Sequence, residues 1–491
     1  MSSYQALEKH FDTIHQYQHM AAILGWDQAT MMASGGQESR AQAMAQLSVH
    51  IHQLYTAPQL TDWIEAAKEQ PLTDHQFANL REIERQVLQH SVLPEKLVKA
   101  KSLAGAKCEH AWRQQRPRND WPGFEKNWAQ VVSLSQEEAQ IRSQHHQLTP
   151  YEAMLDLYEP GMSEQKLDKI FGQTLTWLPN LIDQVIETQP SVSPPSGQYG
   201  THQQKGLGLE IMKLMQFDFE RGRLDESVHP FCGGVPSDTR ITTRYTNNDF
   251  AQSLMGIIHE TGHARYEQNL PKDWSAQPAG QARSMGIHES QSLFFEMQLG
   301  RHPLFLQHVS QHAKRFFDGP EFEPHALAAL YNKVEKSLIR VDADELTYPC
   351  HVILRYEIER DLINGKLSHR DVPEIWNSKM QTYLGLSTLG KDNNGCMQDI
   401  HWTDGSFGYF PSYTLGAMYA AQFMASMKET IDVDSAIQTG DLSPIFNWLN
   451  NNIWSKGSLL TTDDLVKQAT DMTLDPIHFQ NHLRNRYLGK C

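Results

Sequence analysis

The sequence is poor in cysteine, with five residues in 491 and no two of them in a CxxC arrangement. Scattered cysteines of this kind indicate neither a disulfide framework nor a zinc site built from thiolates. We therefore expect all five to be reduced thiols. They are Cys108, Cys232, Cys350, Cys396 and Cys491.

Long apolar runs and an excess of positive charge are also absent. No stretch approaches the ~20 apolar residues that a membrane-spanning helix needs, and the opening MSSYQALEKHFDTIHQYQ is too polar for a signal peptide. The chain holds 43 Lys and Arg against 58 Asp and Glu, a net charge of −15. Nucleic acids and anionic membranes repel such a chain. The sequence predicts a cytoplasmic protein with neither nucleic acid nor membrane as a partner.

The chain does have an ordinary globular composition, 40% hydrophobic and 21% charged, over a considerable length. No linker, composition shift or internal repeat divides it. We expect residues 1–491 to form a single domain, with two lobes around a cleft as the variant of that arrangement.

Helical periodicity dominates, and only TRITTRY at 239–245 alternates in the manner of a short strand. A proline-rich segment at 189–200 predicts a surface loop. The sequence thus predicts a mainly α fold with a small β-sheet close to helix 249–268. The predicted helices are 3–25, 37–55, 76–90, 124–145, 165–187, 202–217, 249–268, 288–299, 324–338, 346–363, 412–428 and 463–471.

One motif carries chemistry: His259-Glu260-Thr261-Gly262-His263. Histidines at i and i+4 share a helix face, so both imidazoles can reach one metal ion. Glu260 would lie beside that ion, where it can accept a proton from the attacking water. Two other His-x-x-x-His pairs, His15 with His19 and His308 with His312, have no carboxylate after the first histidine. Glu260 is therefore the residue that distinguishes this motif from a chance pair of histidines.

The flanking sequence predicts that this motif lies inside a helix, with Asp249 as N-cap and Pro271 after the end. A catalytic zinc site needs a third protein ligand and keeps one position for water. Glu289 is the nearest strong candidate because it opens the next helical pattern, and the adjacent His288 is its rival.

Several further blocks occur in a fixed order along nearly the whole chain, and together they resemble the carboxypeptidase Taq family of zinc metallocarboxypeptidases. The fold of that family resembles the mostly helical zinc peptidases such as neurolysin and angiotensin-converting enzyme, with a deep cleft between two lobes. The blocks are Gly25–Met31, HPFCGG at 229–234, DTRIT at 238–242, HETGH at 259–263, HESQ at 288–291, IRVDAD at 339–344 and GCMQDIHW at 395–402.

The resemblance implies a metal site of His259, His263 and Glu289, with Glu260 as the catalytic base. It implies Zn²⁺ as the cofactor, for which Co²⁺ or Mn²⁺ can substitute in such a ligand set. It further implies peptide substrates with a free C-terminal carboxylate, and a homodimer. Arg340 would bind that carboxylate, since a guanidinium offers two parallel donors. A structural ion pair with a neighbouring aspartate, at 342 or 344, is the alternative for this arginine.

Related helical peptidases stabilise the oxyanion with a histidine and a tyrosine. The matching candidates here are His401, Tyr409 and Tyr413, and the sequence does not separate the two tyrosines. Asp238 and Arg240 are candidates on the substrate side, for which a structural role in the cleft wall is favoured.

The chain departs from the family pattern after HESQS. It reads Leu293-Phe294-Phe295-Glu296-Met297 where Arg-Leu-Trp-Glu-Asn is usual, which leaves open how the surroundings of the metal ligands are built. Two other functions stay open as well. One is a zinc oligopeptidase that cuts inside short peptides, and the other is a non-catalytic binding protein with a relic metal site.

Overall fold

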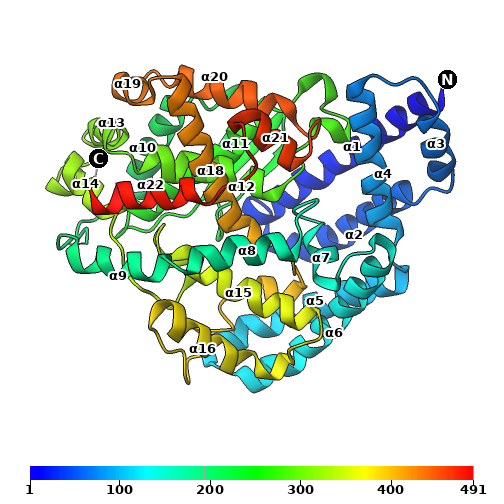
Figure 1. The fold of residues 1–491 in the computed structure, drawn as a ribbon, viewed down its shortest axis with the longest axis horizontal. Coiled ribbons are helices and arrows are strands. Elements are labelled where there is room, and N and C mark those ends of the chain that lie inside the picture. The colour runs from blue at the N-terminus through cyan, green and yellow to red at the C-terminus, as the bar shows by residue number, and fades with distance from the viewer. Residues whose placement is uncertain (193, 490–491) are drawn as a thin grey trace.

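The structure is a computed structural model that describes residues 1–192 and 194–489, so the predicted thiol of Cys491 lies outside the described residues. Helices make up most of the fold (Figure 1). They are α1 (Ser3–Thr30), α2 (Gln37–Tyr55), α3 (Gln59–Lys68), α4 (Asp74–Ser91), α5 (Glu95–Gln115), α6 (Trp121–His146), α7 (Pro150–Leu155), α8 (Glu164–Leu175), α9 (Leu178–Thr188), α10 (Thr201–Leu214), α11 (Ala251–Asn269), α12 (Met285–Leu293), α13 (Pro303–Ala313), α14 (Pro324–Tyr331), α15 (Tyr348–Ile363), α16 (Val372–Leu384), α17 (His401–Asp404), α18 (Pro411–Thr430), α19 (Val433–Thr439), α20 (Ser443–Asn452), α21 (Thr462–Thr470) and α22 (Ile477–Leu488).

A small mixed sheet lies against α11. It comprises β1 (Gly222–Glu226), β2 (Cys232–Val235) and β3 (Asp238–Thr243), in the order β1-β3-β2. β1 is parallel to β3, and β2 is antiparallel to it. Gly234 has φ of 88°, and a Cβ there would lie 2.1 Å from the Asp238 carbonyl oxygen, so the tight β2–β3 turn requires glycine. Ile241 of β3 is fully buried and packs with Ile257 of α11.

The predicted mainly helical fold with a small sheet is confirmed, and the strand expected at 239–245 is β3. The prediction of one helix over 324–338 is wrong in its second half, because α14 ends at Tyr331. Beyond it, the Val334 N–H donates to the Gln189 side chain, whose amide donates back to the Val334 carbonyl, at 2.9 and 2.7 Å. A partner 145 residues away cannot be read from local periodicity.

Two other predicted helices are divided. Residues 165–187 form α8 and α9, which are separated at Trp177 ahead of Pro179, because proline favours the first turn of a new helix. Residues 288–299 fall in α12 and in a π-helical segment at Phe294–Gly300. Among the described helices, none is both long enough and apolar enough to cross a bilayer.

The N-terminal helices have a hydrophobic core of their own. Leu7, Phe11, Leu60 and Ile83 of α1, α3 and α4 belong to a cluster apart from the large core formed by the later helices. In Figure 1, α1 to α4 gather at one side of the molecule, and the C-terminus lies at the other. The division of residues 1–491 into two lobes of one domain stays a prediction.

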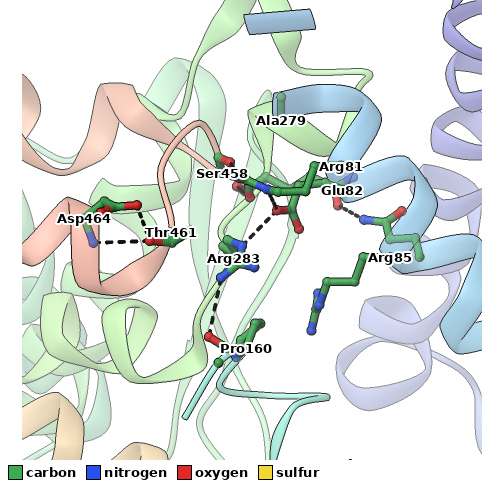
Figure 2. A network of polar contacts seen from close by, with 12 residues as sticks. Arg81, Glu82, Arg85, Pro160, Ala279, Arg283, Ser458, Thr461 and Asp464 are labelled. Atoms are coloured by element: carbon green, nitrogen blue, oxygen red, sulfur yellow. Dashed lines mark hydrogen bonds and ion pairs between the residues drawn. The ribbon is translucent and has the colours of Figure 1, made fainter. Parts of the chain in front are cut away.

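Buried polar groups join these N-terminal helices to the rest, as Figure 2 shows. The Glu82 carboxylate of α4, 3% exposed, accepts hydrogen bonds from Arg81 and Arg283 at 2.7 and 2.8 Å. Arg81 also donates to the Ser458 carbonyl, at 2.6 Å. Removal of one member of a buried ion pair leaves the other charge buried without a partner, which is strongly destabilising. These contacts therefore hold the two hydrophobic cores together.

Candidate active site

The motif histidines lie on α11, as its sequence predicts. The carboxylate of Asp249 accepts the backbone N–H groups of Ala251 and Gln252, at 2.8 and 3.2 Å, so it caps the helix although Phe250 occupies the boundary position. The rings of His259 and His263 are 5.0 Å apart between centroids. Their spacing of four residues is a property of the helix itself.

Glu289 comes to these histidines from α12. Its carboxylate oxygens lie 4.0 Å from His259 Nε2 and 3.4 Å from His263 Nε2. One ligand atom from each of the three residues falls within 4.8 Å of the others. The helices approach this closely at Gly262, where a Cβ would lie 2.5 Å from the Gln291 carbonyl oxygen.

This donor set fits a divalent metal. Two imidazole nitrogens and one carboxylate oxygen converge, which is the protein ligand set of a catalytic zinc site. The second ring nitrogen of His259, Nδ1, bonds the Glu296 carboxylate at 2.9 Å, and Arg301 holds the other oxygen of that carboxylate at 2.8 Å. An imidazole oriented in this way presents Nε2 to the metal.

Burial and charge shift the titration of these groups strongly in the protein without metal. Burial raises the pKa of the Glu260 carboxyl to about 7, although His259 opposes the shift. Burial lowers the pKa of the His263 imidazole to about 4. At His259 burial acts in the same sense, but the hydrogen bond that its imidazole donates to the Glu296 carboxylate and the charge of Glu289 raise its pKa to about 10.

His288, the rival ligand, has another partner. Its Nε2 bonds the Glu267 carboxylate at 2.8 Å, and it is not in the group of converging ligand atoms found among the described residues. Its ring lies against that of His263, with centroids 4.7 Å apart. The geometry therefore favours Glu289 as the third ligand.

A cavity of about 940 Å³ opens over these groups. His259, Glu260, His263 and Glu289 form one part of its lining, and Arg340, Tyr348, Tyr409 and Tyr413 form another. A cavity of this volume can hold a small peptide.

Arg340 is 8% exposed. A carboxylate and a hydroxyl group contact its guanidinium. Its Nε donates to Asp399 at 3.0 Å, and one terminal nitrogen donates to the Tyr348 hydroxyl at 2.8 Å. Its guanidinium also lies over the rings of Phe410 and Tyr413, at 5.0 and 5.3 Å. Its ion pair is thus with a distant residue and with neither neighbouring aspartate in the described chain.

Asp399 belongs to a longer row of buried charges that sequence reasoning missed. Its second oxygen accepts from Arg355 at 3.1 Å, and Arg355 pairs in turn with Glu359 at 2.9 Å. Glu359 accepts the Gly408 backbone N–H at 3.3 Å, in the loop that leads to Tyr409. The sequence did offer one indication of this role, because Asp399 is the acidic residue of the GCMQDIHW block.

His401 lies behind the cavity lining. Its ring stacks on Tyr409 with centroids 6.0 Å apart and an interplanar angle of 12°, and it meets Tyr413 edge-on at 6.5 Å. Burial lowers the pKa of His401 to about 4, so its imidazole is neutral at neutral pH. Both tyrosines line the cavity, and His401 does not.

Asp238 and Arg240 lie on β3, away from the cavity lining. They pair with each other at 2.5 Å, and the Arg240 guanidinium lies 4.4 Å over the ring of Trp26 in α1. The structure therefore does not bring these two residues to the three candidate metal ligands.

Comparisons with known proteins agree on one family. The model of the carboxypeptidase Taq (M32) metallopeptidases matches residues 6–487. Carboxypeptidase 1 of Bacillus subtilis is 34% identical over 484 residues, 96% of each chain. Thermostable carboxypeptidase 1 of Thermus thermophilus is 36% identical over 490 residues, 95% of each chain.

Solved structures give the same result. Metallocarboxypeptidase 1 of Trypanosoma cruzi is 45% identical and superposes with a TM-score of 0.97 over 99% of both chains. The M32 carboxypeptidase of Deinococcus radiodurans is 29% identical, with a TM-score of 0.94 over 99% of this chain and 98% of that one. With a family match that spans nearly all of its residues, the chain belongs to the carboxypeptidase Taq (M32) family of metallopeptidases.

Proposed function

We propose that this chain removes single amino acids from the free C-terminus of peptides with a zinc ion held by His259, His263 and Glu289. Membership of the M32 family makes it a metal-dependent carboxypeptidase. The observation that supports cleavage at the chain end is the position of Arg340, a buried cation that lines the same cavity as the three candidate ligands.

Each of these residues has a separate role in the proposed hydrolysis. Arg340 binds the terminal carboxylate of the peptide by charge-assisted hydrogen bonds, with its orientation fixed by Asp399 and Tyr348. A bound zinc ion lowers the pKa of water and polarises the peptide carbonyl. Glu260 accepts a proton from the attacking water and then gives it to the leaving amine.

The oxyanion needs donors as well. Tyr409 and Tyr413 line the cavity, and burial raises the pKa of each phenol, so both keep the proton that they donate. We propose that His401 acts with Tyr409, on which it stacks. For Asp238 and Arg240 we propose the structural role, because their contacts are with each other and with Trp26.

A matched pair of peptides tests the proposal. One N-terminally blocked peptide carries a free C-terminal carboxylate and the other the same sequence as an amide, and each is incubated with and without a chelator before mass spectrometry. We expect loss of the last residue from the free acid alone, and none with chelator. Equal cleavage of the acid and the amide would instead support the oligopeptidase reading, and no cleavage of either would support the non-catalytic one.

The finer assignments are proposals of the same kind. Zinc is favoured by the two nitrogens and one oxygen of the ligand set, and metal analysis of the purified protein distinguishes it from Co²⁺ or Mn²⁺. The homodimer rests on the family resemblance, and light scattering measures it directly. A cytoplasmic location rests on composition, and cell fractionation tests it.

A further inference from the structure

The two candidate histidine ligands differ in what holds their second ring nitrogen. Nδ1 of His259 bonds the Glu296 carboxylate at 2.9 Å. Nδ1 of His263 is buried and has no hydrogen-bond partner within residues 1–192 and 194–489. Histidines that bind a metal almost always donate their second N–H to a carboxylate, a carbonyl or water, which fixes the orientation of the ring. The orientation of His263 therefore depends on another kind of contact.

The ring of His288 provides that contact. It lies against the ring of His263 with centroids 4.7 Å apart and an interplanar angle of 32°. Aromatic rings attract each other at centroid separations of about 4.5–7 Å when they are offset or tilted. A neighbour on its face restrains the His263 ring from turning, and His263 Nε2 stays directed at the Glu289 carboxylate, 3.4 Å away.

A hydrogen bond to Glu267 holds His288 in this position. Its Nε2 donates to the Glu267 carboxylate at 2.8 Å, and the two side chains are only 18% and 24% exposed. Glu267 lies on α11, one turn after His263, and His288 lies on α12, next to Glu289. The pair thus joins the two helices that carry the candidate ligands.

Packing alone does not enclose His288. Its side chain lines two cavities, of about 140 and 310 Å³, and Glu267 lines both of them as well. The ring of Tyr266 is a further neighbour, with its centroid 5.5 Å away and the planes at 59°. Because there is open space next to the imidazole, the hydrogen bond to Glu267 is what selects the orientation against His263.

We propose that His288 and Glu267 are a positioning pair for His263. Glu267 holds His288, and the ring of His288 holds the His263 imidazole in the direction of the metal. The inference rests on the proposed function, because it takes His263 as a ligand, and it adds two residues to that site. Neither residue lines the large cavity, so both act through His263 rather than on the peptide.

The zinc dissociation constant of the metal-free protein tests the pair without reference to turnover, and competition with a chromophoric chelator measures it. His288→Ala removes the ring, and Glu267→Ala removes the group that holds it. We expect each variant to bind zinc about 10–100-fold more weakly, the usual effect of losing a residue that orients a metal ligand. Since the two residues act as a unit, the double variant should bind no more weakly than the weaker of the single variants.

A further variant separates the ring from the hydrogen bond. In His288→Gln the amide can still donate to Glu267 but there is no ring, so we expect zinc binding as weak as in His288→Ala. His369→Ala is the matched control. His369 also bonds a glutamate, Glu125, at 2.7 Å, with the two side chains 24% and 19% exposed, and it lies outside the lining of the large cavity. This variant should keep the wild-type constant.

The visible absorption spectrum of the Co²⁺-loaded protein gives a second readout, because its bands depend on the arrangement of the ligands and not on overall stability. We expect a changed spectrum in His288→Ala and Glu267→Ala and the wild-type spectrum in His369→Ala. Wild-type zinc affinity or an unchanged spectrum in both alanine variants of the pair would overturn the inference. Additive losses in the double variant, or recovered affinity in His288→Gln, would do the same. A wild-type chain that binds neither zinc nor cobalt would overturn the proposed function, and the inference with it.

Discussion

Among single residues, Glu260 lies beside the two histidines but outside the group of three converging ligand atoms. Glu260→Gln keeps the shape of the side chain and removes the carboxylate that we propose as the base. We expect bound zinc to stay at the wild-type stoichiometry and kcat to fall about 10²–10⁴-fold, the usual contribution of general acid–base catalysis. Metal analysis and steady-state kinetics on the same preparation check this, and a variant with the wild-type rate would contradict the role.

Glu296 orients His259 without being a ligand candidate. Burial opposes its ionisation, yet the hydrogen bond from His259 and the charge of Arg301 lower its pKa to about 2, so it is charged at neutral pH. Glu296→Gln should weaken zinc binding by about 10–100-fold. Competition with a chromophoric chelator measures the dissociation constant. An unchanged constant would mean that His259 holds its orientation by packing alone.

Asp399 lies between two buried arginines, Arg340 and Arg355. Asp399→Asn leaves both cations without their shared counter-ion, so we expect a loss of about 3–5 kcal/mol in the free energy of unfolding. In protein that still folds, KM for the free-acid peptide should rise more than kcat falls. Asp342→Asn is the control, since this exposed residue also lines the cavity and should change stability by less than about 0.5 kcal/mol.

At the scale of elements, the distance between α11 and α12 decides whether Glu289 reaches the histidines. In Gly262→Ala the added methyl group would lie 2.6 Å from Ser292 Cα. Neither atom can move away by a change of side-chain rotamer, because Cα is a backbone atom and Cβ is bonded directly to the backbone. We expect a loss of about 1–3 kcal/mol in stability together with weaker zinc binding.

Gly256→Ala on the same helix is the matched control for that prediction. Its nearest contact outside the helix would be 3.8 Å away, so the better helix propensity of alanine should leave stability equal or raise it by up to about 1 kcal/mol. Thermal unfolding of both metal-free variants gives the comparison. Equal melting temperatures would exclude a tight helix contact at Gly262.

Local patterns and long-range contacts differ in what the sequence reveals about the elements. The pairing of His259 with His263 follows from helix geometry alone, and the alternation of residues along a strand in the same way predicts β3 from local sequence. The end of α14 and the role of Asp399 depend on Gln189 and Arg340, far away in the chain. Periodicity holds no information on such partners, and short elements such as β1, β2 and α3 are stabilised mainly by packing.

At the scale of the whole molecule, buried neutral histidines predict sensitivity to acid. Burial lowers the pKa of His302, His351 and His401 to about 4, from an ordinary value of 6.5. Between these values the unfolded chain binds more protons than the folded one, so the free energy of unfolding falls as pH falls from about 6.5 to about 4. Urea denaturation over that range measures the slope.

A variant identifies the source of that slope. His351 is 1% exposed, and His351→Leu should reduce the slope by about one proton. A slope that His351→Leu leaves unchanged would assign the acid sensitivity to the other two histidines, His302 and His401. A carboxylate such as Asp399 does not contribute over this range, because Arg340 and Arg355 hold its pKa below its ordinary value although burial acts against the shift.

One helix, α18, touches both parts of the cleft. Gly416 packs on Glu289, since a Cβ there would lie 2.7 Å from its Cγ, and Tyr413, one turn earlier, lies under Arg340 at 5.3 Å. On the proposed roles, a single rigid rod fixes the spacing between the metal and the group that holds the end of the peptide. The bond that is cleaved then lies at a fixed distance from the C-terminus of the substrate. Each round therefore shortens a long peptide and a short one by the same single residue.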